Sequence, residues 1–258
     1  MAVALAESPV RVAVARERFY FWMAATCLAV GVIGFAPTYW IPLFGAGRDV
    51  PRLTHIHALF FYGWLLFFLK QTSLASSGAV ARHRELGIAG VALATGMFFV
   101  GTGMALSSIR RSEAAGFGDA ALAFSAVSLT GIVLFAVLFC IAIVNVKKPE
   151  IHKRLILVAT VSILQAAVGR WFVLFLAPPL PPGGHASPPP VSLSVMPALL
   201  VDLLIVAAMI HDRRTRGHVH RVYWIAGGAL LAVQVLRVPL STSHAWTVIA
   251  QWVLTLAP

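Results

Sequence analysis

The chain has 258 residues, of which 59% are hydrophobic and only 11% are charged, and its mean hydropathy is +0.86. Soluble proteins carry about 25% charged residues, so this composition excludes a soluble globular protein and is typical of a polytopic membrane protein. The formal charge of +11 does not indicate nucleic-acid binding, because the basic residues lie in short gaps between apolar segments.

Seven segments are apolar and long enough to cross a bilayer, which requires about 20 helical residues. The predicted fold class is therefore all-α: a polytopic bundle of seven transmembrane helices that forms one integral membrane domain over residues 1–258. The stretch 243–257 is too short to span, and we expect a kinked extension of the seventh helix or an interfacial segment. The seven predicted spans cover approximately residues 19–36, 55–75, 85–107, 120–146, 154–177, 194–211 and 222–240.

The Lys and Arg residues between these spans gather on one side of the membrane, which predicts a cytoplasmic N-terminus and a periplasmic C-terminus in a bacterial inner membrane. The expected partners are the lipid bilayer and other membrane subunits, with no nucleic acid. The opposite side carries Arg48, Arg52, Arg110 and Arg111. The basic side comprises Arg11, Arg16, Arg18, Arg82, Arg84, Lys147, Lys148, Lys153, Arg154, Arg213, Arg214, Arg216 and Arg221.

A histidine with a basic neighbour opens each outward-going helix after the first, in "RHRELG", "EIHKRL" and "GHVHRV". This pattern suggests three related helix hairpins plus one extra helix. Neutral imidazoles bind Zn, Cu and Fe, so His83, His152 and His220, with His211 as an additional candidate, form a predicted metal site. The alternative is that these residues only add to the positive charge of the cytoplasmic surface.

The second predicted helix carries His57, Trp64 and Gln71 at intervals of seven, so they share one helix face. We call this face the polar stripe and expect it to point into the bundle. A bis-histidine haem needs two histidines at one depth, and His57 with His244 is the external pair that the sequence offers. Ordinary hydrogen bonding of these rings is the alternative.

Asp202 lies near the middle of the sixth predicted span. A charge at that depth costs about 2.5–3.5 kcal/mol, so a partner or a neutral form of the carboxyl is expected. Arg170 is the first candidate and Arg237 the second, and Gln165 and Gln234 would complete an intramembrane polar cluster. Such a cluster handles protons or substrate, or it is a structural ion pair. In the third predicted helix, small residues predict close packing against a neighbour: Gly87, Gly90, Ala94 and Gly101.

The chain resembles a family of uncharacterised bacterial multi-pass inner-membrane proteins that share the motifs H-x6-W-x6-Q, H-R-x-L-G and H-K-R-L. The resemblance covers roughly residues 53–165, and it brings no established activity. A fainter similarity links the chain to respiratory-oxidase assembly proteins and to b561-type membrane proteins, although the paired histidines of the latter are not reproduced. The matching positions are His57, Trp64, Gln71, His83, Gly87 and His152.

Three functions follow as hypotheses. The first is a histidine-bearing, metal- or haem-associated membrane protein linked to redox or respiratory processes, with a transition metal or haem as cofactor. The second is a proton-coupled small-molecule transporter that uses Asp202 and Arg170. The third is an accessory or assembly subunit without chemistry of its own. Motifs of hydrolases, nucleotide-binding proteins and HExxH metalloproteases are absent from the sequence.

Overall fold

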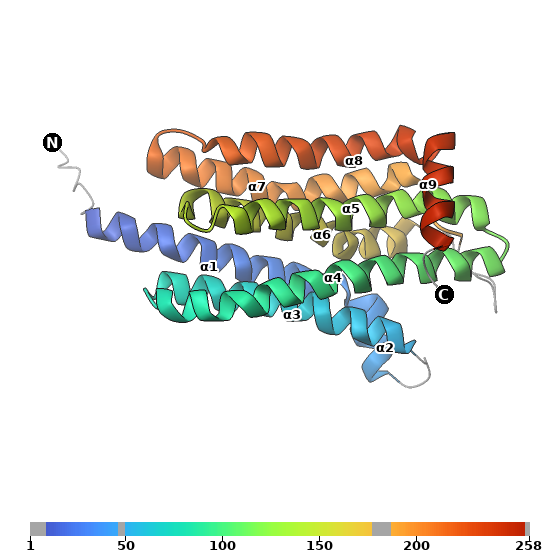
Figure 1. Ribbon diagram of the computed structural model, residues 1–258, viewed down its shortest axis with the longest axis horizontal. Helices are drawn as coiled ribbons and strands as arrows, with labels where there is room; N and C mark the ends of the chain where they lie inside the picture. The colour runs from blue at the N-terminus through green and yellow to red at the C-terminus, as the bar shows by residue number, and fades with distance from the viewer. Residues whose placement is uncertain (1–8, 46–49, 177–186, 256–258) are drawn as a thin grey trace.

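The computed structural model describes residues 9–45, 50–176 and 187–255, and all regular elements in these ranges are helical, which confirms the predicted all-α class (Figure 1). In chain order they are α1 (Pro9–Gly34), the π-helix η1 (Ala36–Trp40), α2 (Ile41–Phe44), α3 (Arg52–Ser76), α4 (Val80–Ala114), α5 (Gly118–Val144), α6 (Pro149–Leu176), the 3-10 helix η2 (Val191–Ser194), α7 (Val195–Arg216), the π-helix η3 (Tyr223–Gly227), α8 (Gly228–Ser241) and α9 (His244–Thr255).

The long helices run back and forth along one axis (Figure 1). The turns α3–α4, α5–α6 and α7–η3 lie together at one end, which we call the basic end. The turn α4–α5 lies with α2 and α9 at the opposite end, which we call the α9 end. This arrangement follows from the short connections, because a helix joined to the next by a few residues must pack antiparallel to it.

Among the described residues, six helices are long and apolar enough to cross a membrane, and the count reaches seven if the bent pair Arg18–Gly34 and Ala36–Phe44 forms one span. The chain therefore has the architecture of a multi-pass membrane protein. The helices extend beyond the predicted apolar segments: α4 covers Val80–Ala114, where 85–107 was predicted. The last residue of the predicted span 154–177 lies outside the described residues.

The first span is broken where α1 meets η1, with a bend of 45° between Arg18–Gly34 and Ala36–Phe44. Pro37 stands at the start of η1 and cannot donate a backbone hydrogen bond, so the regular α-helical ladder cannot continue through it. A π-helical turn is a common way to accommodate such a break. The chain consequently leaves the bundle axis before α3 begins.

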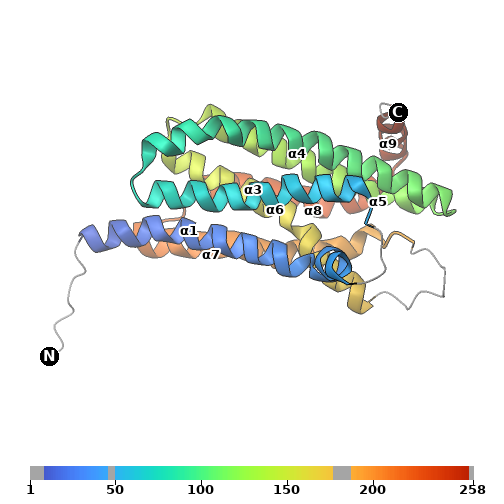
Figure 2. The same ribbon diagram turned by 90° about the horizontal axis from the view of Figure 1, so that it is seen from below.

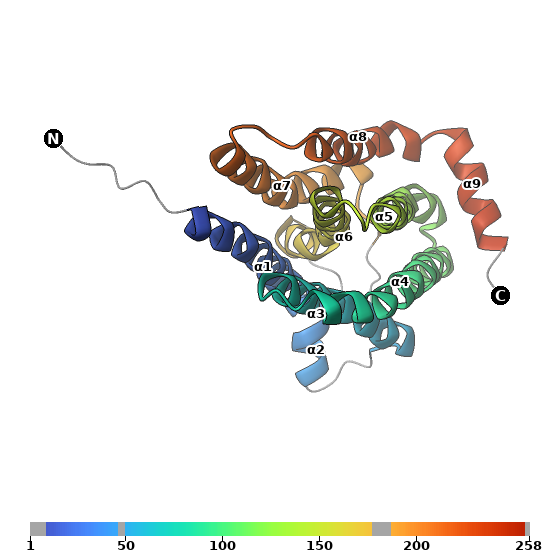
Figure 3. The ribbon, with the colours of Figure 1, turned by 60° about the vertical axis from the view of Figure 1, so that its left-hand side comes forward.

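Helix α6 is the central helix of the bundle, lying among α1, α5 and α7 (Figure 3). Half of its apolar window is buried, compared with 22% for α3 and α4, whose outer surfaces remain apolar and exposed. In a bilayer such exposed apolar faces contact lipid, so the core is smaller than the apolar content suggests. The polar side chains of α6 are therefore the ones that must find partners inside the protein.

Two glycines end helices at the basic end. Gly78 and Gly217 have φ angles of 76° and 78°, in the left-handed region that side chains disfavour. Gly217 directly follows the last residue of α7, and Gly78 comes two residues after the last residue of α3, the usual region for such a residue. Gly217 stops α7 just after Arg213, Arg214 and Arg216, which are favourably placed near the negative end of the helix dipole.

The stretch 243–257, predicted to be a kinked extension or an interfacial segment, contains a separate short helix, α9, as far as it is described. Helix α8 continues through Pro239 to Ser241, and the break comes at residues 242–243. Trp246 anchors α9: its indole N–H donates to the Leu122 carbonyl at 2.9 Å and lies 3.3 Å from Ser125 Oγ, both on α5. Helix α9 lies across the ends of α4 and α5 (Figure 1), as an interfacial helix would.

Close packing of α4 through small residues was predicted, and it is found at Gly90 and Gly101 but not at Gly87. A Cβ at Gly90 would lie 2.6 Å from the Phe67 ring, whereas nothing lies within 4 Å of one at Gly87. The tightest backbone approach is instead at Gly34, where a Cβ would lie 2.7 Å from the backbone carbon and oxygen of Ala167. Gly34 therefore allows α1 to contact α6.

We expect Gly34→Ala to lower the free energy of unfolding by about 1–3 kcal/mol, because the methyl group meets backbone atoms that cannot move aside cheaply. Gly87→Ala is the matched control and should stabilise α4 by up to about 1 kcal/mol, since Ala favours helix and the space is open. Thermal unfolding in detergent, followed by circular dichroism, measures both. Equal effects of the two substitutions would contradict the close approach at Gly34.

Candidate functional site

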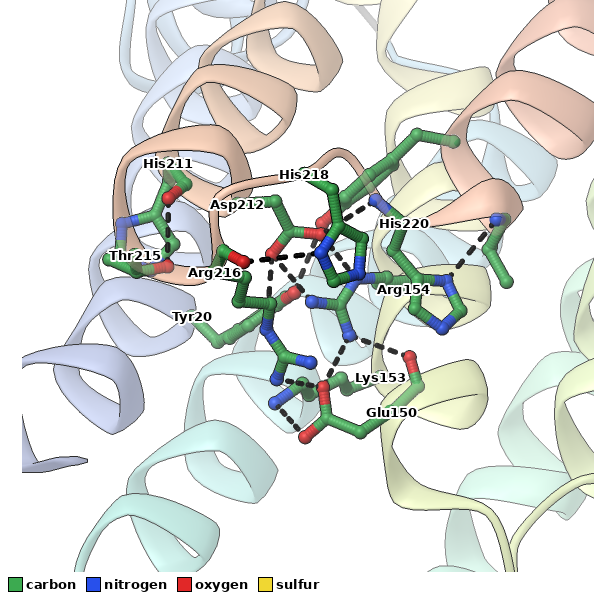
Figure 4. A network of polar contacts seen from close by, with 12 residues as sticks. Tyr20, Glu150, Lys153, Arg154, His211, Asp212, Thr215, Arg216, His218 and His220 are labelled. Atoms are coloured by element: carbon green, nitrogen blue, oxygen red, sulfur yellow. Dashed lines mark hydrogen bonds and ion pairs between the residues drawn. The ribbon is translucent and has the colours of Figure 1, made fainter.

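Arg154, near the start of α6, is the centre of an ion-pair network at the basic end (Figure 4). Its side chain is fully buried. Nε donates to Asp212 Oδ2 at 2.9 Å and Nη2 to Asp212 Oδ1 at 2.5 Å, a two-point contact between α6 and α7. Nη1 donates to the Glu150 backbone oxygen and to its Oε2, each at 2.7 Å. All three guanidinium nitrogens are thus engaged by oxygen acceptors.

Two further cations complete the network. Lys153 Nζ lies 2.8 Å from Glu150 Oε1, and Arg216 contacts Glu150 Oε2. Arg216 Nε also lies 3.7 Å from Asp212 Oδ1. Two carboxylates are therefore shared among three cations of α6 and α7. Bidentate, fully hydrogen-bonded pairs of this kind are the ones that remain favourable when they are removed from water.

Two tyrosines join the network to α1 and η3. The hydroxyl groups of Tyr20 and Tyr223 lie 3.0 Å apart. Lys153 Nζ lies 4.9 Å from the centre of the Tyr20 ring, and the Arg154 guanidinium carbon lies 5.6 Å from that of Tyr223. Cation–π contacts of this length add to the attraction. The network therefore connects α1, α6, α7 and η3, and its described charged groups are all paired, which marks it as structural.

The predicted cytoplasmic histidines divide into two groups. His220 belongs to the network: its backbone N–H donates to Asp212 Oδ2 at 3.3 Å, and its ring Nδ1 accepts from the Val222 N–H at 3.2 Å. Burial, together with the nearby Arg154 charge, lowers the pKa of His220, so its ring is neutral at pH 7. His211 stacks on Phe19 of α1, with ring centres 3.8 Å apart.

His83 and His152 form the second group. His152 directs Nδ1 at the Ala142 carbonyl, 2.9 Å away, so this nitrogen carries the proton. His83 lies beside the Gln71 backbone and close enough to His152 for the two imidazoles to interact electrostatically. His83 Nδ1 and Gln71 Oε1 are buried without a partner among the described residues. The motif positions on α3, α4 and α6 are thus brought together.

A shared metal site of His83, His152 and His220, with His211 as a fourth candidate, is not supported. Within the described ranges, no group of three or more His, Cys, Asp or Glu side chains is arranged to hold a metal ion. The physical reason is that His220 and His211 are each engaged with neighbouring groups of their own, Val222 and Phe19. Sequence spacing placed all four at one end, but it did not define which way each ring points.

The external haem pair was predicted from His57 and His244. His57 stacks on Phe61 of its own helix, with ring centres 4.0 Å apart, and its Nδ1 is buried without a partner in the described part of the chain. His244 is exposed at the first residue of α9, which packs on α5. No contact between described residues joins the two rings, so the fold offers no support for this pair.

The polar stripe points into the bundle at Trp64 and Gln71. Trp64 is 2% exposed, and its indole N–H donates to Thr160 Oγ1 of α6 at 3.1 Å. Its ring meets Phe135 of α5 edge-on, with ring centres 5.3 Å apart. Gln71 is buried at the basic end of the same face. The stripe therefore supplies the polar contact by which α3 reaches the central helix.

The intramembrane polar cluster lies on α6, α7 and α8. Arg237 of α8 is 1% exposed, and its Nη1 donates to Gln165 Oε1 at 2.9 Å. Its Nη2 donates to the backbone oxygen of Ser194 at 3.0 Å. One turn earlier on α8, Gln234 Nε2 donates to Asp202 Oδ1 at 3.3 Å. Four polar side chains from three helices thus meet in the half of the bundle nearer α9.

This cluster is incompletely paired. Arg237 Nε and Gln234 Oε1 are buried without a partner among the described residues. No cation of the described ranges lies within the 4.0 Å of an ion pair from the Asp202 carboxylate, although the Arg237 charge acts on it from farther away. A donor and an acceptor are therefore both open beside a carboxylate. Buried polar atoms left in this state mark sites where water, a proton or a ligand binds.

The contacts of the described residues do not support Arg170 as the partner of Asp202, and Arg237, the second candidate, acts on Asp202 only from beyond ion-pair distance, while Gln234 donates the hydrogen bond. The Arg170 guanidinium carbon lies 5.4 Å from the centre of the Phe35 ring, and its charge acts on His57. Gln165 and Arg170 are five residues apart on α6, which rotates their side chains about 140° from one another. Gln165 therefore faces α8, and Arg170 faces the broken first span.

The Arg154–Asp212 pair was not predicted from the sequence, because the basic residues of both segments were interpreted only as orientation signals. A local signal was available: Glu150 with Arg154, and Asp212 with Arg216, are opposite charges four residues apart, the spacing of paired side chains on a helix, although the predicted spans 154–177 and 194–211 did not extend to Glu150, Asp212 and Arg216. The pairing between the two segments spans 58 residues and depends on helix packing.

No protein-family model, curated protein or solved structure matches this chain.

We expect Asp212→Asn to lower the free energy of unfolding by about 3–5 kcal/mol, because it leaves the buried Arg154 charge without its main counter-charge. The double variant Arg154→Met with Asp212→Leu should recover much of this loss, since no unpaired charge remains. Asp119→Asn, at an exposed position, is the control. Thermal unfolding in detergent compares them, and a double variant no more stable than Asp212→Asn would contradict the assignment.

Proposed function

We propose that this protein is a proton-coupled transporter of small polar molecules in a bacterial inner membrane. In this proposal Asp202 is the group that takes up and releases the proton. The observation that carries the proposal is the state of its carboxylate: it lies midway along an apolar helix, accepts one amide hydrogen bond, and has no ion pair within the described residues.

The physical argument concerns the cost of charge in the membrane. A charged carboxylate at this depth is expensive, and fully paired groups offset that cost with an adjacent cation. At the basic end Asp212 is neutralised in this way, by Arg154 and Arg216. Asp202 has the amide of Gln234 and a more distant Arg237. Protonation removes the charge, so a change of protonation state at Asp202 is the least costly response to its surroundings.

The neighbouring residues have distinct roles in this proposal. Arg237 supplies positive charge that favours the deprotonated state or an anionic group of a solute. Gln165 and the Ser194 carbonyl orient its guanidinium through two hydrogen bonds. The free Nε of Arg237 and the free Oε1 of Gln234 offer one donor and one acceptor to a polar solute. Such a combination recognises a molecule that carries both kinds of group.

The charge distribution supports an orientation with the basic end in the cytoplasm. The turns α5–α6 and α7–η3 carry Lys147, Lys148 and Arg221 and adjoin the basic last turn of α7. Cytoplasmic loops are enriched in such residues. The N-terminus is then cytoplasmic, the α9 end periplasmic, and the intramembrane cluster lies in the outer half of the membrane.

The two other hypotheses have less support. A metal- or haem-associated redox function was based mainly on clustered histidines, and the described residues contain no three-ligand group. An accessory subunit without chemistry would not require a carboxylate beside unpaired buried atoms, because such atoms lower stability. The absence of proton movement in the experiment below would favour the accessory function.

The test is proton flux into proteoliposomes that contain purified protein and an internal pH-sensitive dye. A potassium gradient with valinomycin sets the membrane potential. With a mixture of small polar solutes added outside, we expect the wild-type protein to admit protons faster than empty liposomes do, and Asp202→Asn to reduce the flux to that leak. The amide keeps the size of the side chain but cannot bind and release a proton at neutral pH. Asp202→Glu should retain flux.

Asp119→Asn is the matched control, since it makes the same chemical change at an exposed position near the start of α5. Thermal unfolding of each variant separates loss of function from loss of fold. Full flux in a folded Asp202→Asn protein would exclude Asp202 as the proton carrier. A wild-type flux equal to the leak would reject the proposed function itself.

A further inference from the structure

A shallow surface cavity of about 370 Å³, open to its surroundings, lies between α1 and α3 at the basic end. The two helices pack side by side (Figure 2), and the cavity opens where α3 ends. Its lining residues come from one face of each helix: Arg18, Phe21 and Trp22 on α1, and Ser73, Ser76 and Ser77 at the end of α3. None of them belongs to the ion-pair network or the intramembrane cluster, so the cavity needs its own explanation.

Arg18 supplies the charge of this cavity. Its side chain is exposed and has no ion pair or hydrogen bond among the described residues. It lies beside the last turn of a span-length helix, Arg52–Ser76, so in a membrane it is level with the lipid headgroups. An unpaired guanidinium at this level attracts phosphate, which it can bind through two parallel hydrogen bonds.

The serines make the end of α3 compatible with an anion. Helix carboxyl ends normally repel negative charge, because their last carbonyl oxygens are unpaired. Here Ser76 Oγ and the Ser77 backbone N–H both donate to the backbone carbonyl oxygen of Ser73, each at 3.0 Å. Ser77 Oγ donates to the Leu74 oxygen at 3.2 Å. The Ser73 hydroxyl has no hydrogen bond within the described ranges and can donate into the cavity.

The aromatic side of the cavity faces the bilayer. Trp22 is 63% exposed and lies one helical turn deeper than Arg18. Trp residues favour the boundary between headgroups and acyl chains, where an apolar ring meets a polar edge. A ligand bound to Arg18 thus has an apolar surface immediately below it. Free phosphate has no apolar part to contact that surface, whereas a phospholipid places its glycerol and first acyl carbons there.

We propose that this cavity binds the headgroup of an anionic phospholipid. The phosphate accepts hydrogen bonds from the Arg18 guanidinium and the Ser73 hydroxyl, and the start of the acyl chain packs on Phe21 and Trp22. The site is independent of the proposed transport function, because it shares no residue with the Asp202 cluster. Its ligand chemistry, an anionic phosphodiester with an apolar tail, distinguishes it from sites for soluble anions.

The experiment is native mass spectrometry of the detergent-solubilised full chain titrated with phosphatidylglycerol or phosphatidylcholine. We expect one phosphatidylglycerol to bind more tightly than phosphatidylcholine, and Arg18→Gln to weaken that binding about fivefold. Arg214→Gln is the control, because Arg214 is exposed at the same end but does not line the cavity. It should leave this binding event unchanged. Ser73→Ala should weaken binding by a smaller factor.

Three outcomes would overturn the proposal. Equal binding of the two lipids would show that the headgroup charge is not recognised. Unchanged phosphatidylglycerol binding in Arg18→Gln, with Arg214→Gln behaving alike, would place the lipid elsewhere. Displacement of the bound lipid by inorganic phosphate at equal concentration would identify a site for a free anion. Because Arg18 and Ser73 are not part of the packed core, the variants should fold and the comparison remains decisive.

Discussion

The contact between Arg154 and Asp212 fixes the basic end of the bundle, and the positions of α1, α6, α7 and η3 depend on it. In a membrane there is no hydrophobic force between helices, so packing and polar contacts decide which helices meet. The guanidinium group donates to two oxygens of one carboxylate at 2.9 and 2.5 Å, which defines both the distance and the rotation of α7 relative to α6. Tyr20 and Tyr223 then bring α1 and η3 to the same place. Neither charge could remain buried alone.

The ion-pair network at the basic end and the intramembrane polar cluster both contain buried polar groups, but they differ in how completely those groups are paired. At the basic end the buried oxygens of Asp212 have partners on both sides, and the adjacent Glu150 is shared among three cations. In the intramembrane cluster Arg237 Nε and Gln234 Oε1 are left open within the described structure. Leaving such atoms open has a cost of about 1–3 kcal/mol each, which a purely structural cluster has no reason to bear. This difference, and not the presence of charge as such, separates the candidate functional region from the structural one.

The sequence predicted the fold well because the membrane requires it: apolar length identifies the spans, and backbone groups in lipid must form helices. It also predicted that Gln165 and Gln234 lie with Asp202, since few polar residues occur at that depth. It failed where the answer depends on rotation. Arg170 is close to Gln165 along α6 but faces Phe35, and the cation that contacts Gln165 is Arg237 of α8. The four histidines share one end of the bundle, but their ring directions are set by local partners such as Ala142 and Phe19. These directions are tertiary information that spacing does not contain.

Asp202 and Asp212 both lie on α7, ten residues or about 15 Å apart along its axis. Asp212 holds one end of that helix to α6, while Asp202 contacts α8 through a single amide hydrogen bond. A change in the charge of Asp202 therefore acts on the half of α7 that no ion pair holds within the described residues. Arg237 contacts Gln165 of α6 and the Ser194 carbonyl just before α7, so it is in direct contact with both sides of that interface. In the proposed transport function, we therefore expect hydrogen-bond partners to exchange in the α9 half of the bundle, while the ion pairs of Arg154 hold the basic end together.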